Sequence, residues 1–175
     1  MTQTPKRSSD AYKEDFTYRH NNPYEQKLEE FSHFVYRDNE AEKFNGKWNQ
    51  EVFQNNFPIV AEIGSGYGEF MLEYCQNHCE INFVGIDYRF KRSYQLAKKL
   101  SELPHPNFRY LRAKGERLQF LFGENEVSEI FYFFPDPWPK TKHNKKRLFQ
   151  IPFLKACHHV LKNDGIFWIK TDHDK

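Results

Sequence analysis

The residues best suited to chemistry lie in a proline-rich stretch, residues 131–140. This stretch overlaps an apolar run from Ile130 to Phe134, which is typical of a short strand buried on both faces. Three prolines at alternate positions then end strand pairing and hold Asp136 in a stiff, extended loop. Ligands of open α/β sheets bind just beyond the carboxyl ends of the strands. We therefore expect Asp136 to belong to a binding or catalytic site.

A basic segment follows this carboxylate, with five lysine or arginine residues from Lys140 to Arg147. A carboxylate and the Trp138 ring beside cations suit a nucleobase that is held by its polar edge while phosphates are held nearby. The alternative is a proline-rich turn followed by a solvated run of charge. The order of these elements favours nucleic-acid binding.

A second candidate site is a glycine-rich turn between a strand and a helix. An expected strand, residues 59–63, leads into the sequence G-S-G-Y-G at residues 64–68, and a helix is expected from residue 69 to about residue 78. Glycines allow a backbone to approach a ligand closely, and a helix start offers free N–H groups. Asp87 ends the next expected strand at a spacing typical of a carboxylate that binds ribose hydroxyls.

The acidic residue before that turn distinguishes between possible cofactors. Glu62 lies two residues before Gly64, and the glycine spacing is G-x-G-x-G rather than G-x-G-x-x-G. A carboxylate at this place is unfavourable beside a pyrophosphate but favourable beside an ammonium or sulfonium group. The turn therefore favours S-adenosylmethionine over NAD. The expected cofactor-binding residues are Glu62, Gly64, Gly66 and Asp87.

The elements that position these residues alternate between strand and helix. Strands are expected at residues 59–63, 82–87, 108–111, 128–134 and 166–170, and helices near residues 69–78, 89–100, 117–122 and 146–161. This alternation predicts an α/β fold with a doubly wound, mainly parallel sheet of the Rossmann-like kind. Pro152 inside the last helix predicts a kink, and the sequence N-D-G at residues 163–165 predicts a turn.

The first third of the chain is charged, aromatic and irregular in pattern. We expect residues 1–57 to form an N-terminal extension that caps the core, and residues 58–175 to form the S-adenosylmethionine-binding domain. Within the extension, an amphipathic helix is expected over residues 24–36 and a short helix near Trp48. The alternative to a static cap is a flap that closes over a ligand.

Composition narrows the class of protein and its compartment. The chain has 175 residues, a net charge of +2, and 18 Phe, 10 Tyr and 3 Trp, some of which suit stacking on bases. No apolar run approaches the length of a membrane span, and no signal peptide is apparent. Three cysteines without a pairing framework favour a reducing cytoplasm. Cys75, His78 and Cys79 lack a second ligand pair at zinc spacing, so we expect no metal site.

At these motifs the chain resembles the bacterial tRNA (guanine-N7-)-methyltransferases, which are class I S-adenosylmethionine-dependent enzymes. The matching residues are 19–24, 61–68, 85–87, 134–140 with 143 and 147, and 171–172. The resemblance implies methyl transfer from S-adenosylmethionine to N7 of a guanine in the variable loop of tRNA. It also implies a doubly wound sheet of seven strands.

The resemblance also assigns roles to individual residues. It places Glu62 and Asp87 at the cofactor, and Asp136 both at the cofactor and at the catalytic centre. It makes Lys140 and Asp172 substrate-binding residues. Because guanine N7 carries a lone pair and no proton, the reaction needs positioning and electrostatics rather than a strong base.

Two features depart from the family pattern. Lys114 stands where the family carries an acidic or amide residue aimed at the adenine, and a lysine has no acceptor. The adenine amino group must then bind Glu116 or a backbone carbonyl. The chain also ends at Lys175, so we expect about five of the seven strands and a bare apolar edge on the last one.

Two other functions stay open at this point. The first is a methyltransferase that acts on a protein or a small molecule, because a proline-rich turn after the fourth strand also occurs in enzymes that methylate amino groups. The second is a non-catalytic RNA-binding module that keeps the methyltransferase fold. Monomer and homodimer cannot be distinguished from the sequence.

Overall fold

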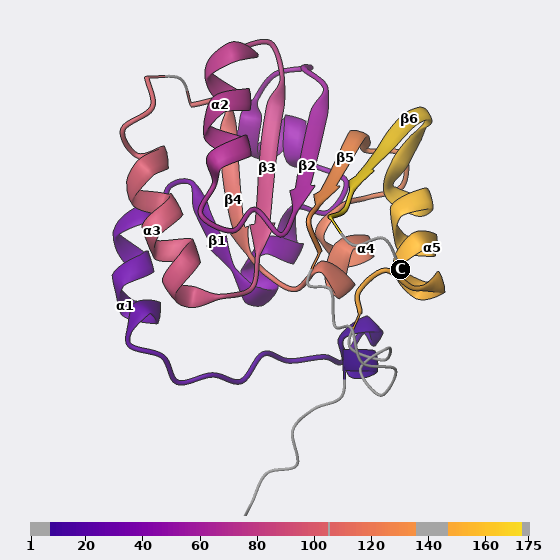
Figure 1. Ribbon diagram of the computed structural model, residues 1–175, viewed down its shortest axis with the longest axis horizontal. Coiled ribbons are helices and arrows are strands. Elements are labelled where there is room, and N and C mark those ends of the chain that lie inside the picture. The colour runs from indigo at the N-terminus through magenta and orange to yellow at the C-terminus, as the bar shows by residue number, and fades with distance from the viewer. Residues whose placement is uncertain (1–7, 105, 136–146, 173–175) are drawn as a thin grey trace, which may run out of the picture.

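In the described part of the chain, six parallel strands form one sheet in the order β1-β4-β3-β2-β5-β6 (Figure 1). This computed structural model describes residues 8–104, 106–135 and 147–172. The strands are β1 Val35–Arg37, β2 Ile59–Ile63, β3 Asn82–Asp87, β4 Phe108–Arg112, β5 Val127–Phe133 and β6 Leu161–Lys170. The chain builds outward from β2 in one direction through β3 and β4, and then in the other through β5 and β6. The predicted doubly wound parallel sheet is confirmed, and its switch point lies between β2 and β5.

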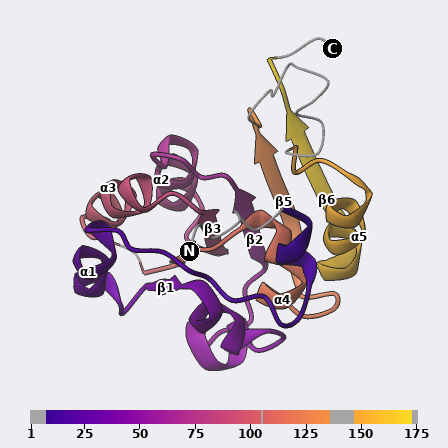
Figure 2. The same cartoon turned by 90° about the horizontal axis from the view of Figure 1, so that it is seen from below.

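Helices cover both faces of this sheet. The α-helices are α1 Tyr24–Leu28, α2 Glu69–Asn77, α3 Phe90–Leu100, α4 Leu118–Leu121 and α5 Ile151–Val160. Short 3-10 helices are η1 Ser8–Tyr12, η2 Glu29–Phe31, η3 Asp38–Phe44 and η5 Gly115–Arg117, and η4 Trp48–Phe53 is π-helical. Helices α1 to α3 gather on one side of the sheet, and α4 and α5 lie on the other (Figure 2).

Two hydrophobic clusters fill the two faces, and β2 contributes to both. Ala61 and Ile63 belong to the cluster beneath α4 and α5, whereas Val60 belongs to the cluster beneath α2 and α3. Every residue of β2 and of β3 is buried. This explains why these two strands read as continuous rather than alternating apolar runs, and why their predicted limits are the observed ones.

The structure corrects the expected helix over residues 24–36. Only α1 and η2 are helical there, and the chain then extends into β1, which pairs in parallel with β4. Val35 lies opposite Tyr110, and the Phe34 carbonyl accepts a hydrogen bond from the Tyr110 amide at 2.9 Å. The partner strand is far away in sequence, so local helical periodicity could not reveal β1. The expected boundary between an extension and a domain near residue 57 stays a prediction, although the extension supplies a strand to the sheet.

One further expectation near the last helix is wrong. Helix α5 begins at Ile151, not near residue 146, so Pro152 falls in its first turn. Proline is well tolerated there because its missing N–H has no partner in the helix, and the expected kink is not needed. The expected turn at residues 163–165 falls where β6 leaves regular pairing with β5: Leu161 pairs with Val127, and the next pair joins Ile166 to Glu129. A Cβ on Gly165 would lie 2.9 Å from the Lys162 carbonyl oxygen, as expected where the chain folds back on itself.

Within the described residues, β6 is the last strand of the sheet on its side. Its side chains Ile166, Trp168 and Ile169 are each nearly half exposed. Trp168 stacks on Phe131 of β5 with ring centroids 6.4 Å apart, and its indole nitrogen donates to Glu129 at 2.7 Å. The strand therefore carries apolar side chains that the described residues do not cover.

Packing at the end of the glycine turn gives the first prediction. Gly68 has φ +83°, and a Cβ there would lie 2.0 Å from a methyl group of the fully buried Leu96 on α3. We expect Gly68→Ala to lower the free energy of unfolding by about 2–4 kcal/mol, from backbone strain plus overpacking. Urea unfolding measures this change.

Gly66→Ala is the matched control, because Gly66 also has a positive φ but a Cβ there would meet only one atom, 3.8 Å away. It should cost only about 1 kcal/mol. Equal losses in the two variants would show that the contact with α3 does not matter.

Candidate functional site

A cleft of about 320 Å³ opens at the carboxyl ends of the strands, beside the switch point. Its wall combines the ends of β2, β3 and β5 with the start of α3 and with η5. Residues on the wall include Gly64, Asp87, Tyr88, Arg92, Glu116 and Phe134. The sheet topology therefore brings the glycine turn, the acidic end of β3 and the end of β5 to one place.

The glycine turn is tied to the end of β3 by backbone hydrogen bonds. The amides of Gly64 and Ser65 both donate to the Ile86 carbonyl, at 2.7 and 3.1 Å. Gly64 has φ +83°, and a Cβ built on it would meet nothing within 4 Å. Glycine is therefore required at residue 64 for the backbone conformation, and its open side leaves room for a ligand to approach the main chain.

Asp87 joins this turn to the start of α3. Its Oδ2 accepts from the Gly66 amide at 3.0 Å, and its Oδ1 accepts from the Arg89 amide at 2.9 Å. The residue is only 8% exposed but lines the cleft. Each carboxylate oxygen can accept a second hydrogen bond, so the aspartate is held by the backbone and keeps capacity for ligand hydroxyls.

Glu62 is a buried carboxyl with an unsatisfied oxygen. It is 5% exposed, and its Oε2 has no hydrogen-bond partner among the described residues. Burial raises the pKa of Glu62 to about 7; a hydrogen bond from Ser65 opposes this rise, and the charges of Asp87 and Glu69 add to it. Glu62 does not itself line the cleft. The next two residues do line it: Ile63 at the end of β2 and Gly64 at the start of the turn. A hydrogen-bond donor with positive charge beside the turn would satisfy this oxygen, so the residues present fit the tail of S-adenosylmethionine.

The other sequence-predicted residues fall in three places. Asp136 and Lys140 lie outside the described residues, although Pro135, which precedes Asp136, lines the cleft. Asp172 is described, is exposed, and follows β6 without lining the cleft. Phe134, directly after β5, has φ +48° and is 55% exposed at the cleft wall.

Lys114, which has no acceptor to offer an adenine, does not line the cleft. Its ammonium lies over the rings of Tyr88 and Phe16, at 5.0 and 5.4 Å from their centroids. Glu116, two residues later, does line the cleft. The carboxylate that the sequence offered as an alternative adenine partner therefore stands on the wall, while its role stays a prediction.

Sequence reasoning missed several wall residues. Tyr88 and Arg89 directly follow Asp87, and Arg92 lies one turn further along α3. Their position immediately after a strand that ends at the site was a usable signal, because side chains at the carboxyl end of a parallel strand face the ligand crevice. Arg92 also lies over the Tyr67 ring of the glycine turn, 5.6 Å from its centroid.

The described part of the chain contains neither a cluster of metal ligands nor a membrane-spanning helix. No group of three or more His, Cys, Asp or Glu side chains among these residues could hold a metal ion. No helix in the same residues has the length and apolar character that crossing a membrane requires.

Comparison with known proteins identifies the class of protein to which the chain belongs. A family model described as "Putative methyltransferase" matches residues 56–175, which is more than half of the chain. The fold agrees, because the 16S rRNA methyltransferase KamB superposes with a TM-score of 0.56 over 70% of this chain and 56% of its own, at 21% identity. The chain belongs to this methyltransferase family.

The curated relatives narrow the family further. The chain is 47% identical over 132 residues to the tRNA (guanine-N(7)-)-methyltransferase of Enterococcus faecalis, covering 75% of this chain and 61% of the relative. It is 37% identical to the enzyme of the same name from Geobacillus thermodenitrificans, covering 84% and 67%. The chain thus belongs to the tRNA (guanine-N7-)-methyltransferase family, as its motifs predicted. It spans about three fifths of the length of relatives such as the first.

The raised pKa of Glu62 gives a prediction about stability. The unfolded carboxyl loses its proton near the ordinary pKa of 4.5, whereas the folded one keeps it until about pH 7. The folded state therefore binds more protons between these values, and its stability falls as pH rises through this window. Glu62→Gln should remove that fall, so the variant should gain up to about 3 kcal/mol over the unchanged chain at pH 8 and little at pH 4.5.

Urea unfolding at several pH values measures this difference. Glu73→Gln is the control, because Glu73 is exposed on α2 and its charge is not among those that raise the pKa of Glu62. Its effect should stay within about 0.5 kcal/mol at every pH. A pH-independent difference between Glu62→Gln and the unchanged chain would contradict the assignment.

Proposed function

We propose that this chain binds S-adenosylmethionine in the cleft and transfers its methyl group to N7 of a guanine in tRNA. The observation that carries the proposal is the buried, unsatisfied Glu62 carboxylate beside a left-handed glycine turn. Such a turn next to a buried carboxyl group suits a nucleoside ligand with a cationic tail, which would stabilise the charged form of the carboxyl, and it disfavours a pyrophosphate. Membership of the tRNA (guanine-N7-)-methyltransferase family supports the same reaction.

The cleft residues share the binding of the cofactor in this proposal. Glu62 accepts the ammonium group of the amino-acid tail, and Asp87 accepts the ribose hydroxyls. Glu116 accepts the adenine amino group in place of Lys114, which has no acceptor to offer. When bound, S-adenosylmethionine supplies a methyl group activated by its positively charged sulfur.

The protein's part in the chemical step is positioning. Guanine N7 has a lone pair and no proton, so no side chain has to act as a strong base. Asp136 holds the N1–H and amino edge of the guanine, which aims N7 at the methyl group and favours the positive charge that develops on the ring. Support comes from chain continuity, because the preceding Pro135 is on the cleft wall.

Cations around the cleft hold the tRNA backbone. Arg89 and Arg92 line the cleft, and the basic segment at residues 140–147 follows Asp136 in sequence. Contacts from these groups to phosphates give affinity rather than base choice. We propose that Lys140 and Asp172 add substrate contacts, that the target guanine lies in the variable loop, and that the reaction takes place in the cytoplasm. Residues 58–175 form the catalytic domain in this scheme, with residues 1–57 as its cap.

A methyl-transfer assay tests the reaction. Incubation of the 175-residue chain with radiolabelled S-adenosylmethionine and unmodified tRNA should label the tRNA, and nuclease digestion should yield 7-methylguanosine. Asp136→Asn should lose activity by about 100-fold or more, because a misplaced base loses orientation and charge stabilisation. Its dissociation constant for S-adenosylmethionine should change little.

Asp164→Asn is the control, since Asp164 is exposed on β6 and does not line the cleft. Label in a protein extract but not in tRNA would favour a protein methyltransferase instead. Cofactor binding without any transfer would favour an RNA-binding module. Near-wild-type turnover by Asp136→Asn would remove that residue from the mechanism.

The basic segment gives a separate prediction about salt. Replacing Lys142, Lys145 and Lys146 together by Ala should raise the tRNA dissociation constant and flatten its salt dependence. Each lost phosphate contact reduces the slope of log affinity against log salt by about 0.7–0.9. Filter binding across a salt series measures the slope.

A second triple variant, Lys43, Lys47 and Lys162 to Ala, removes the same charge from residues that do not line the cleft. It should leave the slope almost unchanged. Equal slopes for both triple variants would refute the phosphate assignment.

A further inference from the structure

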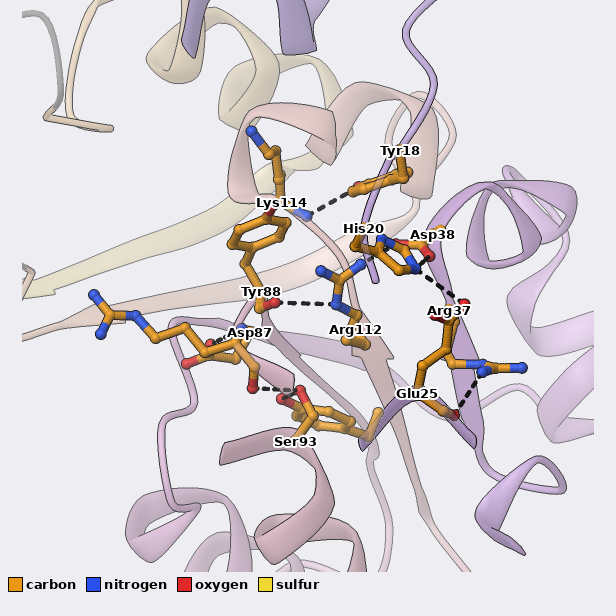
Figure 3. A network of polar contacts seen from close by, with 12 residues as sticks. Tyr18, His20, Glu25, Arg37, Asp38, Asp87, Tyr88, Ser93, Arg112 and Lys114 are labelled. Carbon is orange, nitrogen blue, oxygen red and sulfur yellow. Dashed lines mark hydrogen bonds and ion pairs between the residues drawn. The ribbon is translucent and has the colours of Figure 1, made fainter. Parts of the chain in front are cut away.

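Arg112, the last residue of β4, is a buried cation behind the cleft. Its side chain is 1% exposed, and its Nε donates to the Tyr88 carbonyl at 3.0 Å (Figure 3). Its guanidinium carbon lies 3.9 Å from the ring centroid of Phe90 and 4.6 Å from that of Tyr88. Arg112 therefore contacts both the backbone and the ring of the residue that follows Asp87.

The counter-ion of Arg112 comes from the N-terminal part of the chain. Asp38, which directly follows β1, accepts a hydrogen bond from Nη1 of Arg112 through its Oδ1. Its other oxygen lies 3.2 Å from Nε2 of His20, which in turn lies 3.1 Å from a carboxylate oxygen of Glu25. A polar network thus runs from the N-terminal segment to the turn at Tyr88 (Figure 3).

The path of the N-terminal segment brings these groups to the cleft side of the sheet. Residues 13–23 run past the carboxyl-terminal edge of the sheet between η1 and α1 (Figures 1 and 2). Along this path the Tyr18 hydroxyl accepts from the Lys114 amide at 3.0 Å, and the His20 ring packs edge-on against Phe90 at 4.7 Å. The segment is therefore anchored to the residues that follow β3 and β4.

The backbone at Asp38 has a φ of +54°, in the left-handed region. Aspartate adopts this region more readily than most residues with a side chain. The contacts of its carboxylate with Arg112 and His20 hold the side chain in place.

We infer that Arg112 is a positioning residue for the cofactor and that Asp38 holds it in place; this rests on the proposed binding of S-adenosylmethionine. The carboxylate of Asp87 is oriented by the amides of Gly66 and Arg89, which lie on either side of it. The peptide between Tyr88 and Arg89 carries one of these amides and also the carbonyl that Arg112 binds. By fixing this peptide, Arg112 fixes the Asp87 carboxylate toward the ribose hydroxyls.

A second buried ion pair serves as a control, because it anchors the N-terminal part of the chain but does not contact the residues around Asp87. Arg117 is also 1% exposed, and it binds Glu42 of η3 through two hydrogen bonds of 2.8 and 2.7 Å. Its Nη1 donates to the Ala11 carbonyl at 2.9 Å. None of these partners lines the cleft. The Arg117–Glu42 pair therefore anchors the same N-terminal part without contacting the Asp87 turn.

Four variants test the inference: Arg112→Lys and Asp38→Asn in one pair, and Arg117→Lys and Glu42→Gln in the other. All four should lower stability in urea, because each disturbs a buried ion pair. Only the first two should raise the calorimetric dissociation constant for S-adenosylmethionine, by about tenfold, as expected for loss of one charge-assisted hydrogen bond. The KM for S-adenosylmethionine should rise accordingly while kcat changes less.

Amide hydrogen exchange without cofactor gives an independent readout. In Arg112→Lys the amides of Gly66 and Arg89 should exchange about tenfold faster, because the carboxylate that accepts from them is no longer fixed. In Arg117→Lys their exchange should follow only the change in global stability.

The outcomes distinguish this inference from the proposed function. Equal effects of the two pairs on binding and exchange would overturn the positioning role while leaving cofactor binding intact. If the unchanged chain does not bind S-adenosylmethionine, both proposals fall. Faster exchange at Gly66 and Arg89 together with weaker binding in the first pair alone would support the role.

Discussion

The structure depends on the connection between the end of β3 and the turn after β2. Ile86 accepts the first two amides of the turn, and Asp87 accepts a third from Gly66. These hydrogen bonds fix the left-handed glycines Gly64 and Gly66 at the topological switch point, where the sheet leaves a crevice. Since β3 and β2 are buried along their whole length, the geometry of the turn is set by the most rigid part of the sheet. The shape of the cleft therefore depends on how β2 and β3 are packed in the core.

Charge is distributed unequally around this cleft. The two arginines that are fully buried in the described part of the chain are each paired with a carboxylate from the N-terminal part, Arg112 with Asp38 and Arg117 with Glu42. Glu62 has no such partner among the described residues, and one of its oxygens makes no hydrogen bond there. Each buried cation thus has an internal counter-ion, whereas the carboxyl group of Glu62 beside the glycine turn has none among the described residues. A positively charged ligand could supply that partner.

The sequence predicted those parts of the fold that have a local cause. The limits of β2 and β3 follow from continuous apolar runs, and the glycine turn follows from its spacing. The residues expected at the cofactor, Glu62, Gly64, Gly66 and Asp87, could therefore be placed near one another from the sequence. β1 could not be predicted, because its three residues form a strand only through pairing with β4. The contacts of Arg112 were hidden for the same reason: its partners include residues 38, 88 and 90, which no sequence spacing connects to it.

The position of β1 also constrains how the chain assembles during synthesis. Val35 leaves the ribosome well before its partner Tyr110, 75 residues later (110 minus 35). Strand β1 lies outside β4 in the sheet, so it has no template until β4 has emerged and joined β3. Long-range parallel pairing of this kind forms late, because the intervening loop must be closed first. The nascent N-terminal segment therefore stays unpaired until β4 has joined the sheet. During this interval its aromatic side chains are exposed, and we expect chaperones to bind the chain at this stage.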